Sequence, residues 1–221
     1  FAWMDAATRA LAAELTPGTL VSYETTLPVG TTRDRFAPML EEGSGLTEGG
    51  EDFHLVFSPE RVYSGGRIFA DLRKYPKLIG ALSAEGGARR ARAFYESVLQ
   101  FDPRDDLARP NGVWDLGTAE AAELAKLAET TYRDVNIGLA NQFALFSAAH
   151  GIDVYQVIDA CNSQPFSHIH RPGDRGRRSL HPGLPEALPL DRSRRGHRAH
   201  GPRRERVHAG AHGVAGGERA R

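Results

Sequence analysis

The 221-residue chain contains a single cysteine, Cys161, so it cannot form an intramolecular disulfide, and we expect a reducing, cytoplasmic environment. It has no apolar run long enough to cross a bilayer or to serve as a secretion signal, which argues against a membrane partner. His168 and His170 share one loop without a third metal ligand beside them, so we expect no metal site.

Aromatic residues and isoleucine are absent from residues 174–221, so this segment cannot bury enough apolar surface to offset the entropy of ordering it. It carries 12 arginines against 5 acidic residues, a net charge of +7, whereas residues 1–173 carry 16 basic and 23 acidic residues, a net of −7. We therefore expect an Arg-rich disordered tail. A basic arm for nucleic acid is the alternative, but without lysine or stacking aromatics we expect no nucleic-acid partner.

The first half of the chain alternates strand and helix patterns. Strands are predicted at residues 20–25, 54–60 and 77–82, and helices at 31–42, where Thr31 or Thr32 can cap, and at 84–99. This alternation is typical of βαβ units, a parallel sheet covered by helices, and an α/β fold. The opening FAWMDAATRALAAEL also predicts a helix, with no initiating Met and no strand before it, which we interpret as a fragment boundary.

A long helix is predicted from an N-cap at Thr118 to a stop at His150 and Gly151. At ~1.5 Å per residue it would measure roughly 48 Å, which favours a helix that bridges domains or subunits. Its apolar residues recur at steps of four and three and form one stripe that faces a partner surface: Leu124, Ala128, Tyr132, Val135, Leu139, Phe143 and Phe146. A second helix is predicted from Asp153 to Cys161.

Lys126, Thr130 and Arg133 lie at i, i+4 and i+7 on the side of this helix turned away from Leu124. A cation, a hydroxyl and a guanidinium in that order could hold an anionic or polyhydroxyl ligand. A solvated face of a long helix has the same spacing, and the residues alone leave both readings open.

Polar residues also follow two predicted strands. Glu60 and Arg61 lie at the carboxyl end of one strand, where open α/β sheets bind ligands. Four threonines surround a strand-to-helix turn whose N–H groups could meet a phosphate or ribose, although an ordinary capped turn is the simpler reading: Thr25, Thr26, Thr31 and Thr32. We expect Cys161, Trp3, Trp114 and the phenylalanines of the long helix to pack in the core.

Six ordered segments resemble the UDP-glucose/GDP-mannose dehydrogenase family across nearly all of residues 1–173: LVSYETTLPVGTT, SPERVYSG, YPKLIGA, AEAAELAKLAETTYRDVNIGLANQFA, GIDVYQVIDACNSQPF and HIHRPG. Among its branches, the UDP-N-acetylhexosamine dehydrogenases, such as those acting on UDP-N-acetylmannosamine, resemble the chain more than UDP-glucose dehydrogenases do. Family members oxidise a sugar C6 alcohol to a carboxylate with two NAD⁺, through a cysteine-bound thiohemiacetal and thioester.

The resemblance implies roles for individual residues. Lys126 matches the family lysine that stabilises developing oxyanions. Glu60 matches the glutamate that activates water and transfers protons, and Thr26 matches the threonine that positions that water and the nicotinamide. Three substrate-binding positions follow from the same resemblance: Thr130, which stands where many relatives carry Asn, and His170 and Arg171 in the loop that closes over the nucleotide sugar. Arg133 is a fourth candidate, from its spacing on the helix alone.

The resemblance also implies a domain order. Residues 1–117 match the later part of an NAD-binding Rossmann domain without its first strand and glycine fingerprint, and residues 118–173 match a helical central domain that forms a homodimer through the Thr118–His150 helix. The chain departs from the family after Gly173. Read one base later, the codons of Asp174 through Pro185 can encode IAVGGHCIPVYP, close to the family's nucleophile segment, so we interpret the tail as out-of-frame translation.

Two functions follow from these observations. The first is a nucleotide-sugar 6-dehydrogenase that uses NAD and a UDP-sugar, present here as a truncated fragment that we expect to be inactive. The second is a noncatalytic oligomerisation module built on residues 118–150.

Overall fold

The structure, a computed structural model, describes residues 1–62, 67–83 and 85–173. All of these belong to one compact unit, Phe1–Leu188, while a second unit, Pro189–Arg221, lies outside the described residues, as does the whole expected tail after Gly173. The elements run in this order: α1 (Ala2–Ala13), β1 (Thr19–Tyr23), η1 (Thr32–Phe36), α2 (Ala37–Ser44), β2 (Phe53–Phe57), α3 (Ile68–Lys74), β3 (Lys77–Ala81), α4 (Gly87–Val98), β4 (Val113–Thr118), α5 (Ala119–Ala149) and α6 (Val154–Cys161).

A four-stranded sheet with the order β1-β2-β3-β4 forms the centre of the fold. β1 pairs parallel to β2 and β3 pairs parallel to β4, which confirms the expected Rossmann-like α/β architecture. The middle pairing differs from the expected parallel pattern, because β3 runs antiparallel to β2. The connection through α3 therefore returns to the edge of the sheet where β2 ends, and the start of β3 lies beside the segment that follows β2.

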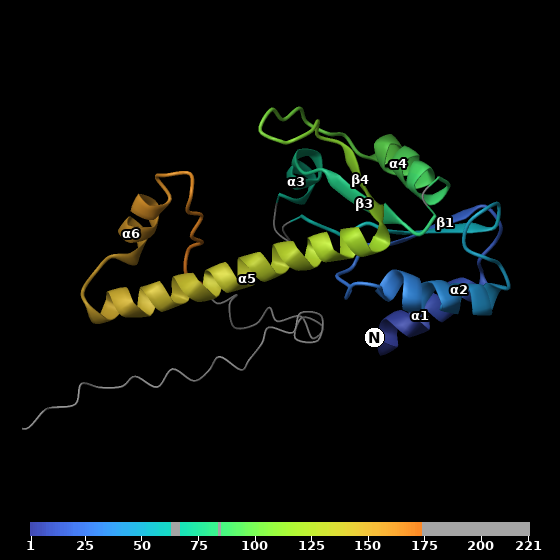
Figure 1. The fold of residues 1–221 in the computed structure, drawn as a ribbon, viewed down its shortest axis with the longest axis horizontal. Helices are drawn as coiled ribbons and strands as arrows, with labels where there is room; N and C mark the ends of the chain where they lie inside the picture. Colours follow the sequence, from blue (N-terminus) through green and yellow to red (C-terminus); the bar gives the residue numbers. More distant parts are fainter. Residues whose placement is uncertain (63–66, 84, 174–221) are drawn as a thin grey trace, which may run out of the picture. The chain divides into compact units, whose positions relative to one another are not determined.

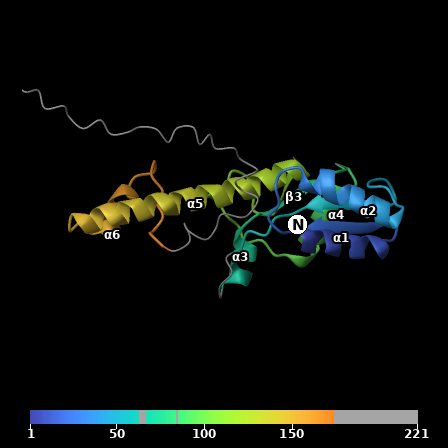
Figure 2. The same ribbon diagram turned by 90° about the horizontal axis from the view of Figure 1, so that it is seen from below.

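Helices cover both faces of the sheet, so β2 is buried along its whole length. Phe53 and Leu55 point to one face and pack in a cluster with residues of α1 and α2, whereas Val56 points to the other face and packs with residues of α4. Figures 1 and 2 show this arrangement, with α1 and α2 side by side on one face and α4 on the other. A strand covered on both faces is continuously apolar, as FHLVF nearly is.

The helix expected after the first strand begins at Thr32, but neither threonine caps it as predicted. The Thr31 hydroxyl donates to the Pro28 carbonyl at 2.7 Å, and the Thr32 hydroxyl donates to a carboxylate oxygen of Glu123 at 2.6 Å. Gly30 permits the tight turn before the helix because its φ is +88°, a left-handed conformation that side-chain-bearing residues rarely adopt.

The long helix agrees with its prediction. The Thr118 hydroxyl accepts the Ala121 N–H at 3.2 Å as an N-cap, and Gly151 follows the last turn with φ +66°. Its first turns pack into the sheet, where Ala119 and Ala122 join Leu27, Phe36 and Phe57 in one buried cluster. Asp153 caps α6 by accepting the N–H groups of Tyr155 and Gln156.

The core assignment of several aromatics was wrong. Trp3 is 91% exposed on α1, and Phe143 and Phe146 are 38% and 61% exposed on α5, so none of the three packs in the core. Trp114 and Cys161 are half-buried. Among the helices described here, none combines the length and apolar character that spanning a membrane requires.

Candidate functional site

The segments after β1 and β2 remain paired beyond the ends of the strands. The Ser58 N–H donates to the Tyr23 carbonyl and the Glu60 N–H donates to the Glu24 carbonyl, each at 2.9 Å. Thr26, which is half-buried, follows the paired Glu24 by two residues. The carboxyl edge of the sheet therefore places the segments of Thr26 and Glu60 beside each other.

Lys126 reaches the same edge from α5. Its ammonium donates a hydrogen bond to the backbone carbonyl of Glu60. Burial lowers the pKa of Lys126, and Arg133 acts in the same direction, while the carboxylates of Glu129 and Glu60 act against it. The predicted cation and the predicted acid thus meet at one site, from elements 66 residues apart in sequence.

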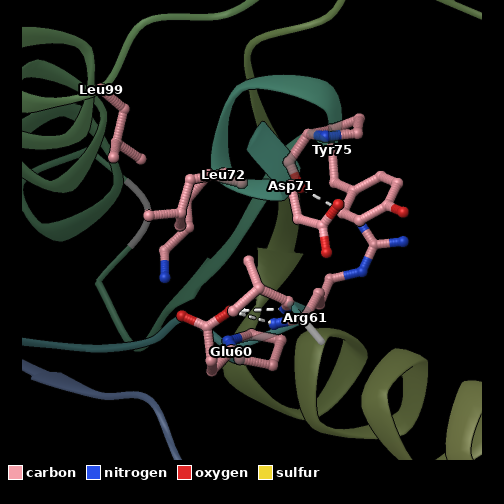
Figure 3. Close-up of a pocket in the computed structure, with 10 residues that line it drawn as sticks. Glu60, Arg61, Asp71, Leu72, Tyr75 and Leu99 are labelled. Atoms are coloured by element: carbon pink, nitrogen blue, oxygen red, sulfur yellow. Dashed lines mark hydrogen bonds between the residues drawn. The ribbon is translucent and has the colours of Figure 1, made fainter. Parts of the chain in front are cut away.

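The Glu60 carboxylate is held by the backbone that follows it. One oxygen, Oε1, accepts the N–H groups of Arg61 at 2.6 Å and Val62 at 2.7 Å. Within the described residues, Oε2 makes no hydrogen bond and can accept or deliver a proton. Figure 3 shows Glu60 and Arg61 on one side of a small cleft, with Leu72 and Tyr75 on the other.

Arg61 binds the loop after β2 to α5. Its guanidinium forms an ion pair with Glu129, including a bond from Nε to Oε1 at 2.8 Å, and donates to the Pro76 carbonyl at 3.0 Å. Glu129 follows Lys126 by one turn of α5, so this ion pair and the Lys126 hydrogen bond connect the same two segments.

A polar network of Lys77, Glu24 and Tyr95 lies beside this edge, with Lys77 and Tyr95 buried and Glu24 partly exposed. Lys77, at the start of β3, places its ammonium 3.2 Å from a Glu24 carboxylate oxygen and 4.7 Å from the centre of the Tyr95 ring. The Tyr95 hydroxyl donates to the other Glu24 oxygen, and its partner Ser22 lies 2.8 Å away. Burial, followed by the Glu24 contact, raises the pKa of Tyr95 to about 12.

Glu123 is a site residue that sequence reasoning missed. Its side chain is fully buried, and its carboxylate accepts three hydrogen bonds from the turn after β1: the Gly30 N–H at 2.6 Å, the Thr32 N–H at 2.9 Å and the Thr32 hydroxyl. One signal was available, since Glu123 shares a helix face with the buried Ala119, Ala122 and Leu127.

These contacts bear on the predicted anion site at the threonine-rich turn. The N–H groups of Gly30 and Thr32, which could have met a phosphate, donate to Glu123 of the chain itself. The turn is therefore capped internally, as in the simpler reading of the sequence.

The remaining substrate-binding candidates lie further along α5 or after α6. The Thr130 hydroxyl donates to the carbonyls of Lys126 at 2.9 Å and Leu127 at 3.1 Å, within its own helix. Arg133 is exposed, one turn beyond Thr130. Thr130 lies beside Lys126 on the helix, and Arg133 extends the same face.

His170 and Arg171 belong to the loop after α6, which is bound to the second half of α5. The His170 N–H donates to Asn136 at 2.7 Å, and Arg171 lies 3.3 Å from an Asp159 carboxylate oxygen and over the Tyr155 ring. Asn136 lies ten residues beyond Lys126, or about 15 Å along a helix. The structure thus brings Glu60 and Lys126 into contact, leaves Thr26 two residues beyond Glu24 in the adjoining segment, and places His170 and Arg171 separately, at the second half of α5.

Comparison with known proteins identifies both parts of the chain. Residues 1–99 match the model of the UDP-glucose/GDP-mannose dehydrogenase family, NAD binding domain, and residues 120–177 match the central domain of the same family. A UDP-N-acetyl-D-mannosamine dehydrogenase of Pyrococcus horikoshii is 40% identical over 171 residues, which are 77% of this chain and 37% of that protein. The chain therefore spans little more than a third of this relative's length.

Solved structures give the same picture. The structure of the UDP-D-ManNAc dehydrogenase from Pyrococcus horikoshii aligns with a TM-score of 0.67 and 38% identity, over 77% of this chain and 37% of that one. An NDP-N-acetyl-D-galactosaminuronic acid dehydrogenase from Methanosarcina mazei aligns with a TM-score of 0.61 and 35% identity, over 78% and 34% of the two chains. The fold of the described residues is thus a fold that occurs as part of larger enzymes.

Proposed function

This chain belongs to the UDP-glucose/GDP-mannose dehydrogenase family, and from that premise we propose that it supplies the catalytic edge of an NAD-dependent nucleotide-sugar 6-dehydrogenase. The substrate class that we propose is a UDP-N-acetylhexosamine, because similar proteins include a UDP-N-acetyl-D-mannosamine dehydrogenase. The observation that carries the proposal is the contact between the Lys126 ammonium and the Glu60 carbonyl at the carboxyl edge of β1 and β2.

In this proposal Lys126 stabilises the negative charge that develops on the oxygen at the sugar's C6. Its ammonium is half-buried, so its interaction with a developing oxyanion is less screened than it would be in water. To meet the substrate, the ammonium would exchange the Glu60 carbonyl for the substrate oxygen. Removal of one such donor from an enzyme typically costs a factor of about 10² to 10³ in kcat.

Glu60 and Thr26 handle protons and water. Oε1 of Glu60 is fixed by two backbone N–H groups, and Oε2 would take a proton from the attacking water or the alcohol. Thr26 follows Glu24, whose carbonyl accepts the Glu60 N–H, by two residues, and its hydroxyl would orient that water.

The residues at this edge fit the reacting end of NAD. Two parallel strands end here, and ligands of open α/β sheets bind at such carboxyl ends. NAD⁺ supplies the hydride acceptor of the proposed reaction, and Thr26 would hold the nicotinamide. The sequence contains no G-x-G-x-x-G segment to cradle a pyrophosphate, so we assign to this chain only contacts at the nicotinamide end.

The substrate would extend from Lys126 along α5. Thr130 and Arg133 continue the Lys126 face, and His170 and Arg171 lie in the loop bound to Asn136, in the direction in which an elongated nucleotide sugar can reach. The guanidinium groups of Arg133 and Arg171 are exposed and suit contact with phosphate oxygens.

We propose two domains, residues 1–117 and 118–173, and the separate family matches to residues 1–99 and 120–177 support this division. We also propose that residues 174–221 are read in the wrong frame, a segment outside the described residues. Nucleotide sequencing across the Gly173 codon tests this: an unambiguous read whose offset frame lacks a cysteine motif would refute it. The cytoplasm is the proposed location, in keeping with the unpaired Cys161.

A chimera tests the activity. Residues 1–173 of this chain would replace the matching segment of the Pyrococcus horikoshii relative, and NADH formation with UDP-N-acetylmannosamine would be measured. We expect turnover in the chimera, a loss of about 10² or more in its Lys126→Met variant, and none from the 221-residue chain itself. A folded chimera without turnover, or a fully active Lys126→Met variant, would contradict the proposal.

We further propose that α5 mediates a homodimer, with oligomerisation alone as the alternative function. The expected stripe is exposed along the helix, including Tyr132 at 56%, Val135 at 59% and Leu139 at 48%. A continuous exposed apolar stripe favours burial against a partner, and a second copy of α5 presents a complementary surface.

A further inference from the structure

The buried carboxylate of Glu123 connects α5 to the turn after β1. Oε2 accepts the Gly30 N–H and Oε1 accepts both donors of Thr32, so each oxygen is engaged by a different residue of the turn. These contacts bridge 91 to 93 positions of sequence. A single side chain thus fixes the position of α5 relative to the end of β1.

Glu123 closes a ring of contacts around the candidate site. It lies one helical turn before Lys126, whose ammonium donates to the Glu60 carbonyl. The Glu60 N–H donates to the Glu24 carbonyl, and the chain continues from Glu24 through Thr26 to Gly30, where it meets Glu123 again. All three candidate catalytic residues lie on this ring.

The three donors of the turn explain why this position holds a carboxylate. Burying a charged group is costly, and an apolar residue of similar size is often neutral or stabilising where a buried charge is replaced together with its partners. Here two of the partners are backbone N–H groups of Gly30 and Thr32, which no substitution removes, so an apolar residue would leave them without an acceptor. What an apolar residue cannot do is bind three donors of the turn at fixed positions.

A second contact between α5 and the turn is partly exposed and does not bind the buried donors. Arg33, next to Thr32, forms an ion pair with Glu120, one turn before Glu123, at 2.5 Å. Both side chains are partly exposed, so the pair is screened by water and contributes little. It provides a matched control, since its removal deletes a carboxylate at the same junction without affecting the buried contact.

We propose that Glu123 is a positioning residue that holds the Lys126 ammonium at the Glu60 carbonyl by fixing α5 to the Gly30–Thr32 turn. Its effect on catalysis rests on the proposed function, because Glu123 would act only through Lys126 and touches no reacting atom. The structural content of the proposal is independent of any nucleotide. Loosening the turn contact frees the Lys126 side chain while the sheet remains intact.

The lysine content of the chain allows a direct test. The sequence has three lysines, and each occupies a different environment: Lys74 is exposed, Lys77 is buried in β3, and Lys126 is at the site. With ¹³C-labelled lysine, Cε relaxation in the full 221-residue chain reports the mobility of each side chain separately. Lys74 gives the mobile limit, and Lys77 reports whether the sheet remains packed.

We expect a restricted Lys126 in the wild type. In Glu123→Gln, the Lys126 Cε mobility should rise towards that of Lys74, with Lys77 unchanged. Thr32→Val removes only the hydroxyl donor and should raise the Lys126 Cε mobility by a smaller amount. It also provides a test if Glu123→Gln fails to fold. Glu120→Gln should leave Lys126 restricted.

Two results would overturn the proposal. One is a Lys126 side chain that stays as restricted as in the wild type in folded Glu123→Gln or Thr32→Val. The other is equal loosening of Lys77 and Lys126, which would mark Glu123 as a general stabiliser of the fold. Neither result depends on substrate, so the outcome is separate from the chimera assay, which can fail while Glu123 still positions Lys126.

Discussion

The ammonium of Lys77 lies 3.2 Å from a carboxylate oxygen of Glu24, and the Lys77 side chain is only 8% exposed. The antiparallel pairing of β2 and β3 makes this contact possible, because it brings the start of β3 to the end of β2. The backbone carbonyl of Glu24 also accepts the Glu60 N–H. This ion pair, buried on its Lys77 side, therefore supports the segment from which Glu60 projects.

Loss of the Glu24 charge should destabilise the chain. In Glu24→Gln the buried Lys77 ammonium loses its only carboxylate partner among the described residues, while its contacts with the Ser58 carbonyl and the Tyr95 ring remain, and the expected decrease in the free energy of unfolding is about 1–3 kcal/mol, measured by urea denaturation. Glu24 is partly exposed, so water limits the loss. Glu42→Gln on the exposed surface of α2 is the control and should stay within about 0.5 kcal/mol of the wild type. Equal stability of both variants would contradict this prediction.

Lys126 should titrate below a free lysine side chain, whose pKa is about 10.4, because burial lowers its pKa. Two substitutions should shift the midpoint in opposite directions. Glu129→Gln removes a carboxylate that raises the pKa, so the midpoint should fall further, whereas Arg133→Gln removes a cation that lowers it, so the midpoint should rise. The ¹³Cε shift of Lys126 against pH measures all three. If the midpoint of Lys126 shifted in the same direction in both variants, Glu129 and Arg133 would not act on its pKa in opposite directions, which would contradict this prediction.

Burial raises the pKa of Glu123 despite its three donors, and this predicts a specific pH dependence of stability. A carboxyl group with a raised pKa in the folded state binds protons more tightly than in the unfolded chain. Its contribution is therefore fully present below the pKa of the unfolded state and is lost as pH rises through the folded value. The free energy of unfolding of the wild type minus that of Glu123→Gln should fall as pH increases from about 4.3.

Denaturation of both proteins across mildly acidic to neutral pH gives this difference. Subtraction is needed because the pKa of Glu120 is lowered by Arg33, which gives an opposite dependence in both proteins. A difference that rises with pH would show that the three donors outweigh burial at Glu123.

The features that could be predicted from the sequence are those set by residues close together in the chain, such as helix caps. Thr118 caps α5 through a contact three residues away, and Asp153 caps α6 in the same manner, so both helix starts were visible as short motifs. The family resemblance supplied Glu60 and Lys126, which the structure then brings together. Trp3 was placed in the core by its residue type alone, and the absence of a covering element could not be foreseen.

Long-range relationships could not be predicted from patterns. Glu123 was missed because its partners, Gly30 and Thr32, are more than 90 residues away and are backbone or hydroxyl groups that carry no sequence signal for pairing. The antiparallel β3 has the same composition as a parallel strand, so only the tertiary connection reveals its direction.

The last prediction concerns the homodimer proposed to form through the apolar stripe of α5. Leu139 is 48% exposed near the middle of the helix, and a second copy would cover it. Leu139→Asp would place a charge in that contact, where it could be neither solvated nor paired. We expect the wild type to sediment as a dimer and Leu139→Asp to shift towards the monomer at the same concentration.

The matched control is Val98→Asp, which puts the same charge at a 57% exposed apolar position on α4, away from the stripe. It should leave the dimer unchanged, and circular dichroism should show that both variants keep their helices. If the wild type sediments as a monomer at all accessible concentrations, the stripe has no partner in a second copy of this chain. If Val98→Asp dissociates the dimer as strongly as Leu139→Asp, the interface lies elsewhere, because only the α5 contact predicts a difference between these two exposed apolar positions.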